Sequence, residues 1–465
     1  MNEEKIVTRS EILAKFLHSK GGMAGACILF LLIATSIYAV VAVPLSTYNK
    51  WNDPIYWQDY PKTVPPEWSN VGGGLAKTQI LSLADAEKNE SSVQGIRTVS
   101  YTWKVNYDYN SFPSDFAIAA TAHYSSTPTI RFDVLRPDGR DFKIYYNTFP
   151  PPKSDNSTTS IRILSSDTIS SLDGYAGEFS CNTSPSKPQI MVFANEKNCS
   201  VLKGAYSISA TFQFFTRTDY ASDLRLVLAG QVFGLMGTDS VGRDLSIGIL
   251  WGTPVALFIG LSVAVASTII GLIYGVISGY KGRYADEGMM RVSDIFYSLP
   301  FLPLLIILSI SLGRSIFLFV GFLVLLGWVG MAKIGRSLSL QIKSLPYVEA
   351  AKLMGESDFK VIRRHVIPQL VPIAFASIAI SVPTAILGEA ALSFLGLGDP
   401  TIPTWGRILH DAQEVGAITN GWWWWTLLPG FMIALTGAAF VLIGNSLNAI
   451  VDPRARPARV RAVAK

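Results

Sequence analysis

The sequence predicts a mainly α-helical, polytopic membrane protein with six transmembrane helices and a β-rich domain, a β-sandwich, between the first two. The 465 residues have a mean hydropathy of +0.32 and 16% charged residues. This is too apolar for a soluble protein and too polar for one that lies wholly in a membrane. Six apolar runs of roughly spanning length are separated by polar segments, and residues 46–236 contain no such run.

The chain begins with a segment, residues 1–21, in which apolar and basic residues alternate at helical spacing. We expect a cytoplasmic amphipathic leader that lies on the inner face of the membrane. Residues 22–45 contain the first predicted span, which is apolar from Met23 to Val43. A cleaved signal peptide is the alternative, but the apolar run is longer than a usual signal core.

Alternating patterns predict strands in the insert, residues 46–236. Apolar and polar residues alternate from Val99 to Tyr109 and again from Tyr206 to Phe214, the period-2 pattern of half-buried strands. Two further alternating runs flank the turn Pro137–Gly139 and predict a hairpin. Several short strands separated by Ser/Thr/Pro loops favour a β-sandwich outside the cytoplasm.

Two cysteines of the insert, Cys181 and Cys199, lie eighteen residues apart. Outside the cytoplasm we expect them to form a disulfide, and two buried free thiols are the alternative. The insert also carries four N-glycosylation sequons, at Asn89, Asn156, Asn182 and Asn198. Their confinement to this domain agrees with an outward location, although such triplets also arise by chance in a Ser/Thr-rich chain.

Residues 237–450 form the predicted helical core, with five more spans. These are Ile247–Ile277, Asp294–Leu312 (with a kink near its start at Pro300 and Pro303), Ile316–Ala332, Val371–Leu392 (interrupted by Pro372 and Pro383) and Leu427–Ile450. Gly271, Gly275 and Gly279 repeat every fourth residue, which predicts close packing of a neighbouring helix. Glu389, near the far end of the fifth span, is a candidate translocation-path residue, and plain solvation at the interface is the alternative.

The distribution of basic residues predicts the topology. The leader carries four Lys or Arg, the loop 280–291 three, the stretch 333–364 seven, and the tail 451–465 five. The two short loops on the other side carry one each. The positive-inside rule therefore places both termini in the cytoplasm and the insert outside it.

The stretch from Pro346 to Pro368 lies between two apolar runs and is too charged to span a membrane. We expect Ala350, Ala351 and Gly355 to lie near one another on a helix face and to leave a shallow surface for another protein's backbone. A basic helix should follow and stop at Pro368. An ordinary basic loop is the alternative.

Glu349-Ala350-Ala351, Gly355 and Pro368 resemble the EAA loop of importer permeases in the ATP-binding cassette (ABC) superfamily. His365 together with Pro368 resembles the dipeptide, oligopeptide and nickel branch, and the segment Gly237–Asp244 resembles the peptide permeases of that branch. Ser393–Gly398 is similar to the outer loop of the family. In that family the loop, here 345–368, is a coupling helix that docks into a groove on an ATPase. A second Glu-Ala-Ala, at 389–391, has apolar surroundings and lacks the following glycine.

The resemblance implies a permease subunit of an ATP-driven importer in the cell membrane, working by alternating access. Its implied partners are a second homologous permease subunit, two ABC ATPase subunits and an extracytoplasmic substrate-binding protein, besides the lipid bilayer. The chain has no phosphate-cradling glycine loop, so ATP hydrolysis is expected in the partners, and this chain is not expected to be an enzyme. No cofactor, metal site or nucleic-acid partner is expected.

Three alternatives remain open at this stage. The same transporter class carries oligosaccharides or nickel as well as peptides. A membrane receptor with an outer β-sandwich would need a cytoplasmic signalling domain, and a membrane-anchored enzyme would need a catalytic constellation in the insert. The insert itself departs from the family, and we favour a docking platform for the binding protein over a second ligand site.

Overall fold

The computed structural model describes residues 15–153, 157–180 and 187–451. Within it the chain divides into two compact units. A helical unit contains the chain up to Asn52 and from Ile247 onwards, and a β-rich unit contains Asp53–Ser246. Each unit is described separately below.

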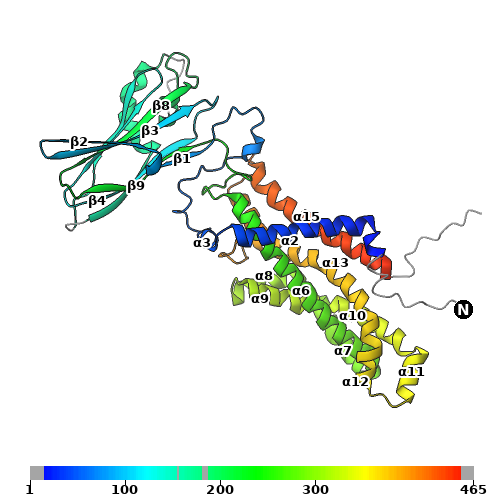
Figure 1. Ribbon diagram of the computed structural model, residues 1–465. Helices are drawn as coiled ribbons and strands as arrows, with labels where there is room; N and C mark the ends of the chain where they lie inside the picture. Colours follow the sequence, from blue (N-terminus) through cyan, green and yellow to red (C-terminus); the bar gives the residue numbers. More distant parts are fainter. Residues whose placement is uncertain (1–14, 154–156, 181–186, 452–465) are drawn as a thin grey trace, which may run out of the picture. The chain divides into compact units, whose positions relative to one another are not determined.

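The helical unit is a set of helices that run in the order shown by the colours of Figure 1. They are α2 (Lys20–Ala42), α3 (Leu45–Asn49), α6 (Leu245–Lys281), α7 (Arg283–Ser298), α8 (Phe301–Leu312), α9 (Ile316–Gly327), α10 (Val329–Lys343), α11 (Pro346–Leu353), α12 (Asp358–Val361), a π-turn (Ile362–Val366), α13 (Ile367–Phe394), α14 (Trp405–Glu414) and α15 (Trp423–Val451).

Five helical stretches of the described residues are long and apolar enough to cross a membrane: Lys20–Ala42, Leu245–Lys281, Ile316–Lys343, Asp358–Phe394 and Trp423–Ile450. A sixth results if α7 and α8, which meet at an angle of 80°, are counted as one broken span. The helical part of the predicted fold is thus a multi-span bundle with five to six crossings.

The third predicted span differs from the structure at its beginning. Residues 283–298 are helical as α7, so the expected basic loop is reduced to a turn at Gly282, whose φ is +67°. Glycine adopts such a φ readily because it has no Cβ. The bend comes at Leu299, which is extended because it precedes Pro300.

Helices α2, α13 and α15 pack side by side in the helical unit (Figure 1). An added Cβ at Gly25 of α2 would lie 2.7 Å from the carbonyl oxygen of Ala439 in α15, so these two helices touch through their backbones. The two prolines that were expected to interrupt the fifth span, Pro372 and Pro383, lie inside the continuous helix α13. Proline is tolerated inside membrane helices because neighbouring helices and local adjustments of the backbone satisfy the polar groups that it leaves unpaired.

The β-rich unit consists of two antiparallel sheets. Its strands are β1 (Gln79–Ser82), β2 (Glu87–Val93), β3 (Ile96–Tyr107), β4 (Asp115–Tyr124), β5 (Thr129–Leu135), β6 (Asp141–Thr148), β7 (Ser157–Leu164), β8 (Gly204–Phe214) and β9 (Tyr220–Ala229). One sheet has the order β1-β9-β4-β7 and the other β2-β3-β8-β5-β6.

Alternate residues of these strands build one hydrophobic core with contributions from both sheets. In β3, for example, Trp103 and Tyr107 are 0% and 2% exposed, whereas Lys104 between them is exposed. The predicted strand patterns and the hairpin β5–β6 are confirmed. Because the buried aromatics fill the core, they are not available as a ligand-binding surface.

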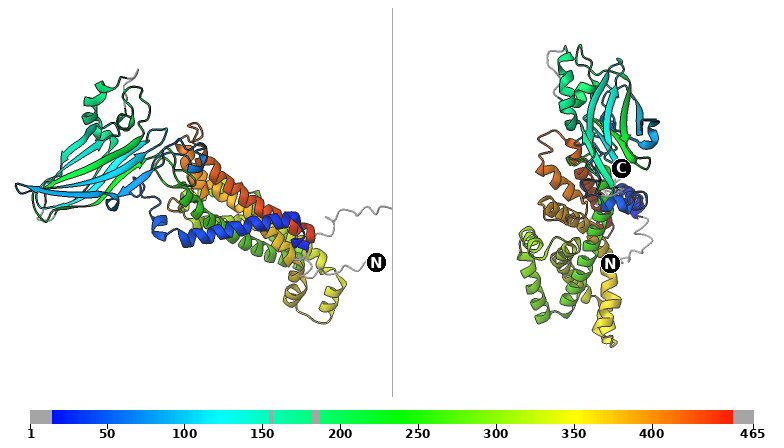
Figure 2. Two further views of the ribbon diagram at one scale, coloured as in Figure 1. Left: turned by 45° about the horizontal axis from the view of Figure 1, so that its top comes forward. Right: turned by 90° about the vertical axis from the view of Figure 1, so that its left-hand side faces the viewer.

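Short helices between β7 and β8, among them α4 (Ile169–Leu172) and α5 (Pro188–Phe193), lie together at one side of the unit (Figure 2). Arg136, beside the β5–β6 turn, ties α5 to the sheet. Its guanidinium is fully buried and donates to the carbonyl oxygens of Met191 and Ala194 at 3.3 and 2.7 Å. These bonds satisfy the C-terminal carbonyls of a helix too short to be stable alone.

The segment 237–244 closes the β-rich unit by joining its two ends. The amide of Val64 donates to the Thr238 hydroxyl at 3.1 Å, and the amide of Thr63 donates to the Asp239 carbonyl at 2.8 Å. An added Cβ at Gly242 would lie 3.0 Å from the carbonyl oxygen of Trp57. We call the paired segments 57–67 and 233–244 the stem.

The last residue of the stem motif, Asp244, was interpreted as a helix N-cap, and the structure agrees. Its carboxylate accepts hydrogen bonds from the backbone N–H and the hydroxyl of Ser246 at 2.9 and 2.6 Å. This satisfies one of the unpaired amides at the start of α6.

Candidate functional site

The loop at 345–368 contains the short helix α11, which begins at Pro346. Proline suits the first helical position, where its missing N–H has no intrahelical partner in any case. Val348 and Ala351 are 1% and 3% exposed and pack into the helical unit, whereas Ala350 is exposed. The loop is therefore anchored by one side of α11 and presents the other.

The prediction that Ala350, Ala351 and Gly355 share one open helical face is wrong. Helix α11 ends at Leu353, so Gly355 lies beyond it, and Ala351 is buried. Spacing along an ideal helix could not show where this helix ends.

Gly355 terminates α11. Its φ is +87°, its amide donates to the Lys352 carbonyl at 3.0 Å, and the Glu356 amide donates to the Ala351 carbonyl at 3.1 Å. This pair of bonds around a left-handed residue is the Schellman arrangement, which glycine forms without strain. An added Cβ at Gly355 would meet nothing within 4 Å, so here glycine is required by conformation and not by space.

Three large apolar side chains are exposed around the end of α11, and the sequence analysis missed them. Leu353, Met354 and Phe359 are 89%, 80% and 74% exposed. With the exposed Glu349 and Ala350 they form what we call the α11–α12 surface. Large apolar residues inside a charged, non-spanning loop could have predicted this surface from the sequence, because exposed apolar groups mark contact surfaces.

Glu356 and His365 connect the two halves of the loop. His365 Nε2 lies 3.0 Å from Glu356 Oε2, and Lys360 and Arg364 lie 3.3 and 3.8 Å from the other carboxylate oxygen. Desolvation raises the pKa of Glu356, but the hydrogen bonds and charges of His365 and Lys360 outweigh it and hold this pKa below its usual value.

The helix after Glu356 was expected to stop at Pro368, and this is wrong. A π-turn, Ile362–Val366, leads directly into α13, with the Ile367 amide bonded to the Ile362 carbonyl. The wider turn shifts the hydrogen-bond register just before Pro368, which then occupies the first turn of α13, where proline is tolerated.

The glycine stripe of α6 lies directly against the backbone around α10. At each glycine an added Cβ would lie 2.1–2.6 Å from a carbonyl oxygen. The pairs are Gly271 with Trp328, Gly275 with Ala332 and Gly279 with Arg336. Because these glycines have no side chains, the two backbones can touch over about two helical turns.

Glu389 lies on α13 and is 7% exposed. It lines a partly open pocket between α8, α9, α13 and the segment before α14, with a cavity volume of about 20 Å³. The Ser393 hydroxyl donates to its carboxylate at 2.5 Å, and the Thr404 side chain also bonds to it. The pocket was not predicted, because its walls come from segments far apart in the sequence.

The sequons and cysteines of the insert fall partly outside the described residues, which exclude Asn156, Asn182 and Cys181. Asn89 is exposed on β2, and Asn198 is exposed after α5. Asn198 accepts from the amide and hydroxyl of Ser200 at 3.1 and 2.8 Å. The Cys181–Cys199 bridge stays a prediction, while Cys27 in α2 carries a free thiol.

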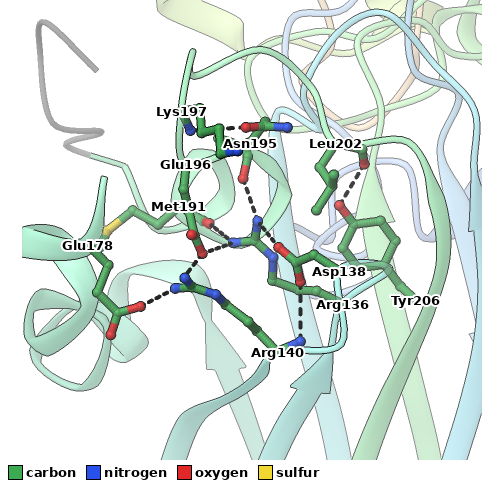
Figure 3. Close-up of polar contacts among 11 residues, drawn as sticks. Arg136, Asp138, Arg140, Glu178, Met191, Asn195, Glu196, Lys197, Leu202 and Tyr206 are labelled. Carbon is green, nitrogen blue, oxygen red and sulfur yellow. Dashed lines mark hydrogen bonds and ion pairs between the residues drawn. The ribbon is translucent and has the colours of Figure 1, made fainter. Parts of the chain in front are cut away.

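The β-rich unit contains an ion cluster beside the β5–β6 turn (Figure 3). Arg136 pairs with Asp138 at 3.0 Å, and Arg140 pairs with Glu196 at 2.6 Å and with Glu178. Arg136 is buried and each charged member of the cluster pairs with an opposite charge, so the cluster stabilises the turn.

One group of described residues has potential metal-ligand atoms close together. The ligand atoms of His410, Asp411 and Glu414 on α14 lie within 4.8 Å of one another. Asp411 is paired with Arg407 at 2.9 Å, and His410 Nδ1 bonds to the Phe394 carbonyl at 2.8 Å. We assign no ion to this partly exposed group.

Comparison with known proteins places the similarity in the helical unit. Residues 267–457 match the family described as the binding-protein-dependent transport system inner membrane component. A dipeptide transport system permease protein of Bacillus subtilis (strain 168) is 38% identical over 221 residues, which are 47% of this chain and 68% of that protein.

An oligopeptide transport system permease protein of Haemophilus influenzae is 34% identical over 247 residues, 52% of this chain and 78% of that protein. Among solved structures, a chain of a methionine ABC transporter in inward-facing conformations has a TM-score of 0.35 at 18% identity, covering 43% of this chain and 96% of that one.

Proposed function

The chain belongs to the family of binding-protein-dependent transport system inner membrane components and is a permease subunit of an ABC importer; from this premise we propose that it carries peptides. The observation that carries the substrate class is the 38% identity with most of a dipeptide permease. A small solute bound by a separate protein would be released to the helical unit and pass through it.

We propose that the α11–α12 surface docks on an ABC ATPase. Its exposed Leu353, Met354 and Phe359 would enter an apolar groove, and the anchored side of α11 would transmit the motion to the helical unit. The rigid connection is the Glu356–His365 contact and the π-turn that continues into α13. A helix held on one side and exposed on the other is suited to passing force between proteins.

The proposed assembly has two permease subunits, two ATPases and an extracytoplasmic substrate-binding protein. Both termini would be cytoplasmic and the β-rich unit extracytoplasmic, an orientation that the distribution of Lys and Arg supports. We assign the β-rich unit as a β-sandwich, on the basis of its two antiparallel sheets and common core, and as a docking platform for the binding protein.

The proposal is tested by co-expressing this chain with its partner permease, ATPases and binding protein and reconstituting them in liposomes. ATP-dependent uptake of a labelled dipeptide supports peptide import. Uptake of Ni²⁺ or an oligosaccharide in its place would overturn the peptide assignment and favour the other substrates of this class. A Walker A lysine variant of the ATPase is the matched control and should abolish uptake.

A further inference from the structure

The pocket at Glu389 has the composition of a binding site for an organic ion. Its walls include the apolar side chains of Ile316, Phe319 and Leu392, and its buried polar groups converge on one carboxylate. Ligand sites are typically mostly apolar pockets with a few placed polar groups. A buried acid in a membrane helix is functional by default, because burying a charge without a partner is costly.

No cation neutralises Glu389 among the residues that the structure describes. Its two hydrogen-bond partners, Ser393 and Thr404, are neutral hydroxyls. Arg314 lines the pocket but is exposed at its rim and forms no ion pair with Glu389 within 4.0 Å. The Glu389 carboxyl group therefore has two hydroxyl partners and lacks a counter-charge among the described residues.

The other acid of the pocket, Asp399, is already used by the protein. One of its carboxylate oxygens accepts from the Ile316 amide at 3.2 Å, and the other accepts from the amide and hydroxyl of Thr401 at 3.0 and 2.6 Å. These bonds shape the loop beside the pocket. Glu389 is thus the acid of this pocket that is placed to receive a ligand.

We infer that this pocket receives the α-ammonium group of a transported peptide, with the ammonium on Glu389 and the first side chain against Phe319 and Leu392. A bare metal ion is a poorer fit, because Mg²⁺ and Ca²⁺ need six or more oxygen ligands and this site offers one carboxylate and two hydroxyls. The inference rests on the proposed peptide import and goes beyond it by naming the recognised group.

The test measures binding of leucinamide and N-acetyl-leucinamide, which share a side chain but differ in the ammonium, to the full chain in lipid nanodiscs at about pH 6.5. The wild type should bind leucinamide about tenfold more tightly, as a hydrogen-bonded ion pair implies. Glu389→Gln should bind both equally, and Glu414→Gln, which removes an exposed acid on α14, should behave as wild type.

Equal binding of the two probes to the wild type, or an unchanged preference in Glu389→Gln, would overturn the inference. Should Glu389→Gln not fold, Ser393→Ala retains the carboxylate and removes one of its donors, and it should reduce the preference. An unchanged preference in Ser393→Ala would then count against the inference.

Uptake by the reconstituted transporter separates this inference from the proposed function. Free dipeptide should be preferred to its N-acetylated form, and Glu389→Gln should abolish that preference. If leucinamide binding depends on Glu389 but no peptide is taken up, the pocket assignment stands and peptide import fails. If peptides are taken up with no dependence on Glu389, import stands and the pocket assignment fails.

Discussion

His365 Nε2 lies 3.0 Å from Glu356 Oε2, and this contact joins the end of α11 to the π-turn before α13. The two residues are nine positions apart, on opposite sides of α12. A displacement of α11 therefore reaches α13 through a side-chain contact as well as through the backbone.

The pH dependence of this contact follows from the lowered pKa of Glu356. A depressed folded-state pKa contributes stability that is present above the unfolded value, 4.5, and is lost as the pH falls through the folded value. In hydrogen exchange, residues 358–366 should be better protected in the wild type than in Glu356→Gln above about pH 4.5. The difference should decline below pH 4.5 and vanish once the pH is below the lowered pKa of folded Glu356. A difference that persists in stronger acid would contradict this origin.

Substitutions at Gly355 separate conformation from close approach. Gly355→Ala forces a left-handed residue with a Cβ and should destabilise the end of α11 by about 1–2 kcal/mol. Gly355→Asn tolerates that conformation better and should retain more ATPase-coupled uptake than Gly355→Ala. If Gly355→Ala instead retains uptake while Gly355→Asn and Gly355→Arg lose it, the size of the side chain decides the outcome. Glycine would then be needed to leave space for the backbone of an ATPase.

The contact between α6 and α10 should be sensitive to a single methyl group. Gly275→Ala places a Cβ 2.1 Å from the Ala332 carbonyl oxygen and should destabilise the helical unit by about 1–3 kcal/mol. Gly321→Ala is the matched control, because nothing lies within 4 Å of its Cβ. Thermal unfolding in detergent should show a lower midpoint for the first variant only; equal midpoints would argue against the close packing.

Because the two segments of the stem are paired, we expect that the insert can be removed without separating its chain ends. The Glu67 amide donates to the Gly234 carbonyl and the Phe233 amide to the Pro65 carbonyl, at 2.9 and 3.0 Å, so the chain ends of the insert are already adjacent. Replacing residues 70–231 with a short Gly/Ser linker should therefore preserve membrane insertion and ATPase association and weaken docking of the binding protein.

A deletion that also removes the stem, residues 53–244, is the comparison for that variant and should be expressed less well. Co-purification with the ATPases and binding-protein affinity give the two readouts. Unchanged affinity for the binding protein after the stem-retaining deletion would refute the platform role.

Cys181 and Cys199 should form an intradomain disulfide. Mass spectrometry of non-reduced tryptic peptides from fresh membranes should find the linked pair, and closing an eighteen-residue separation should stabilise the domain by about 3 kcal/mol. Recovery of both as alkylated thiols would exclude the bridge. The free thiol of Cys27 serves as the internal control for alkylation.

The sequence by itself determined the features that depend on local pattern. Apolar runs predicted the spanning helices, period-2 alternation predicted β3, β8 and the β5–β6 hairpin, and the glycine repeat predicted a packing stripe on α6. Each is a periodic property of a contiguous segment, and the hydrophobic effect acts on it in any context that offers a buried face.

Only the tertiary structure decided the features that depend on where elements end and meet. The burial of Ala351 follows from packing, and the continuation through Pro368 follows from a hydrogen-bond register that spacing does not encode. The Glu389 pocket joins residues from 309 to 404, and the stem joins residues from 57 to 244. Such contacts depend on how segments far apart in the chain pack together. The local sequence around each residue carries no pattern that identifies its distant partner.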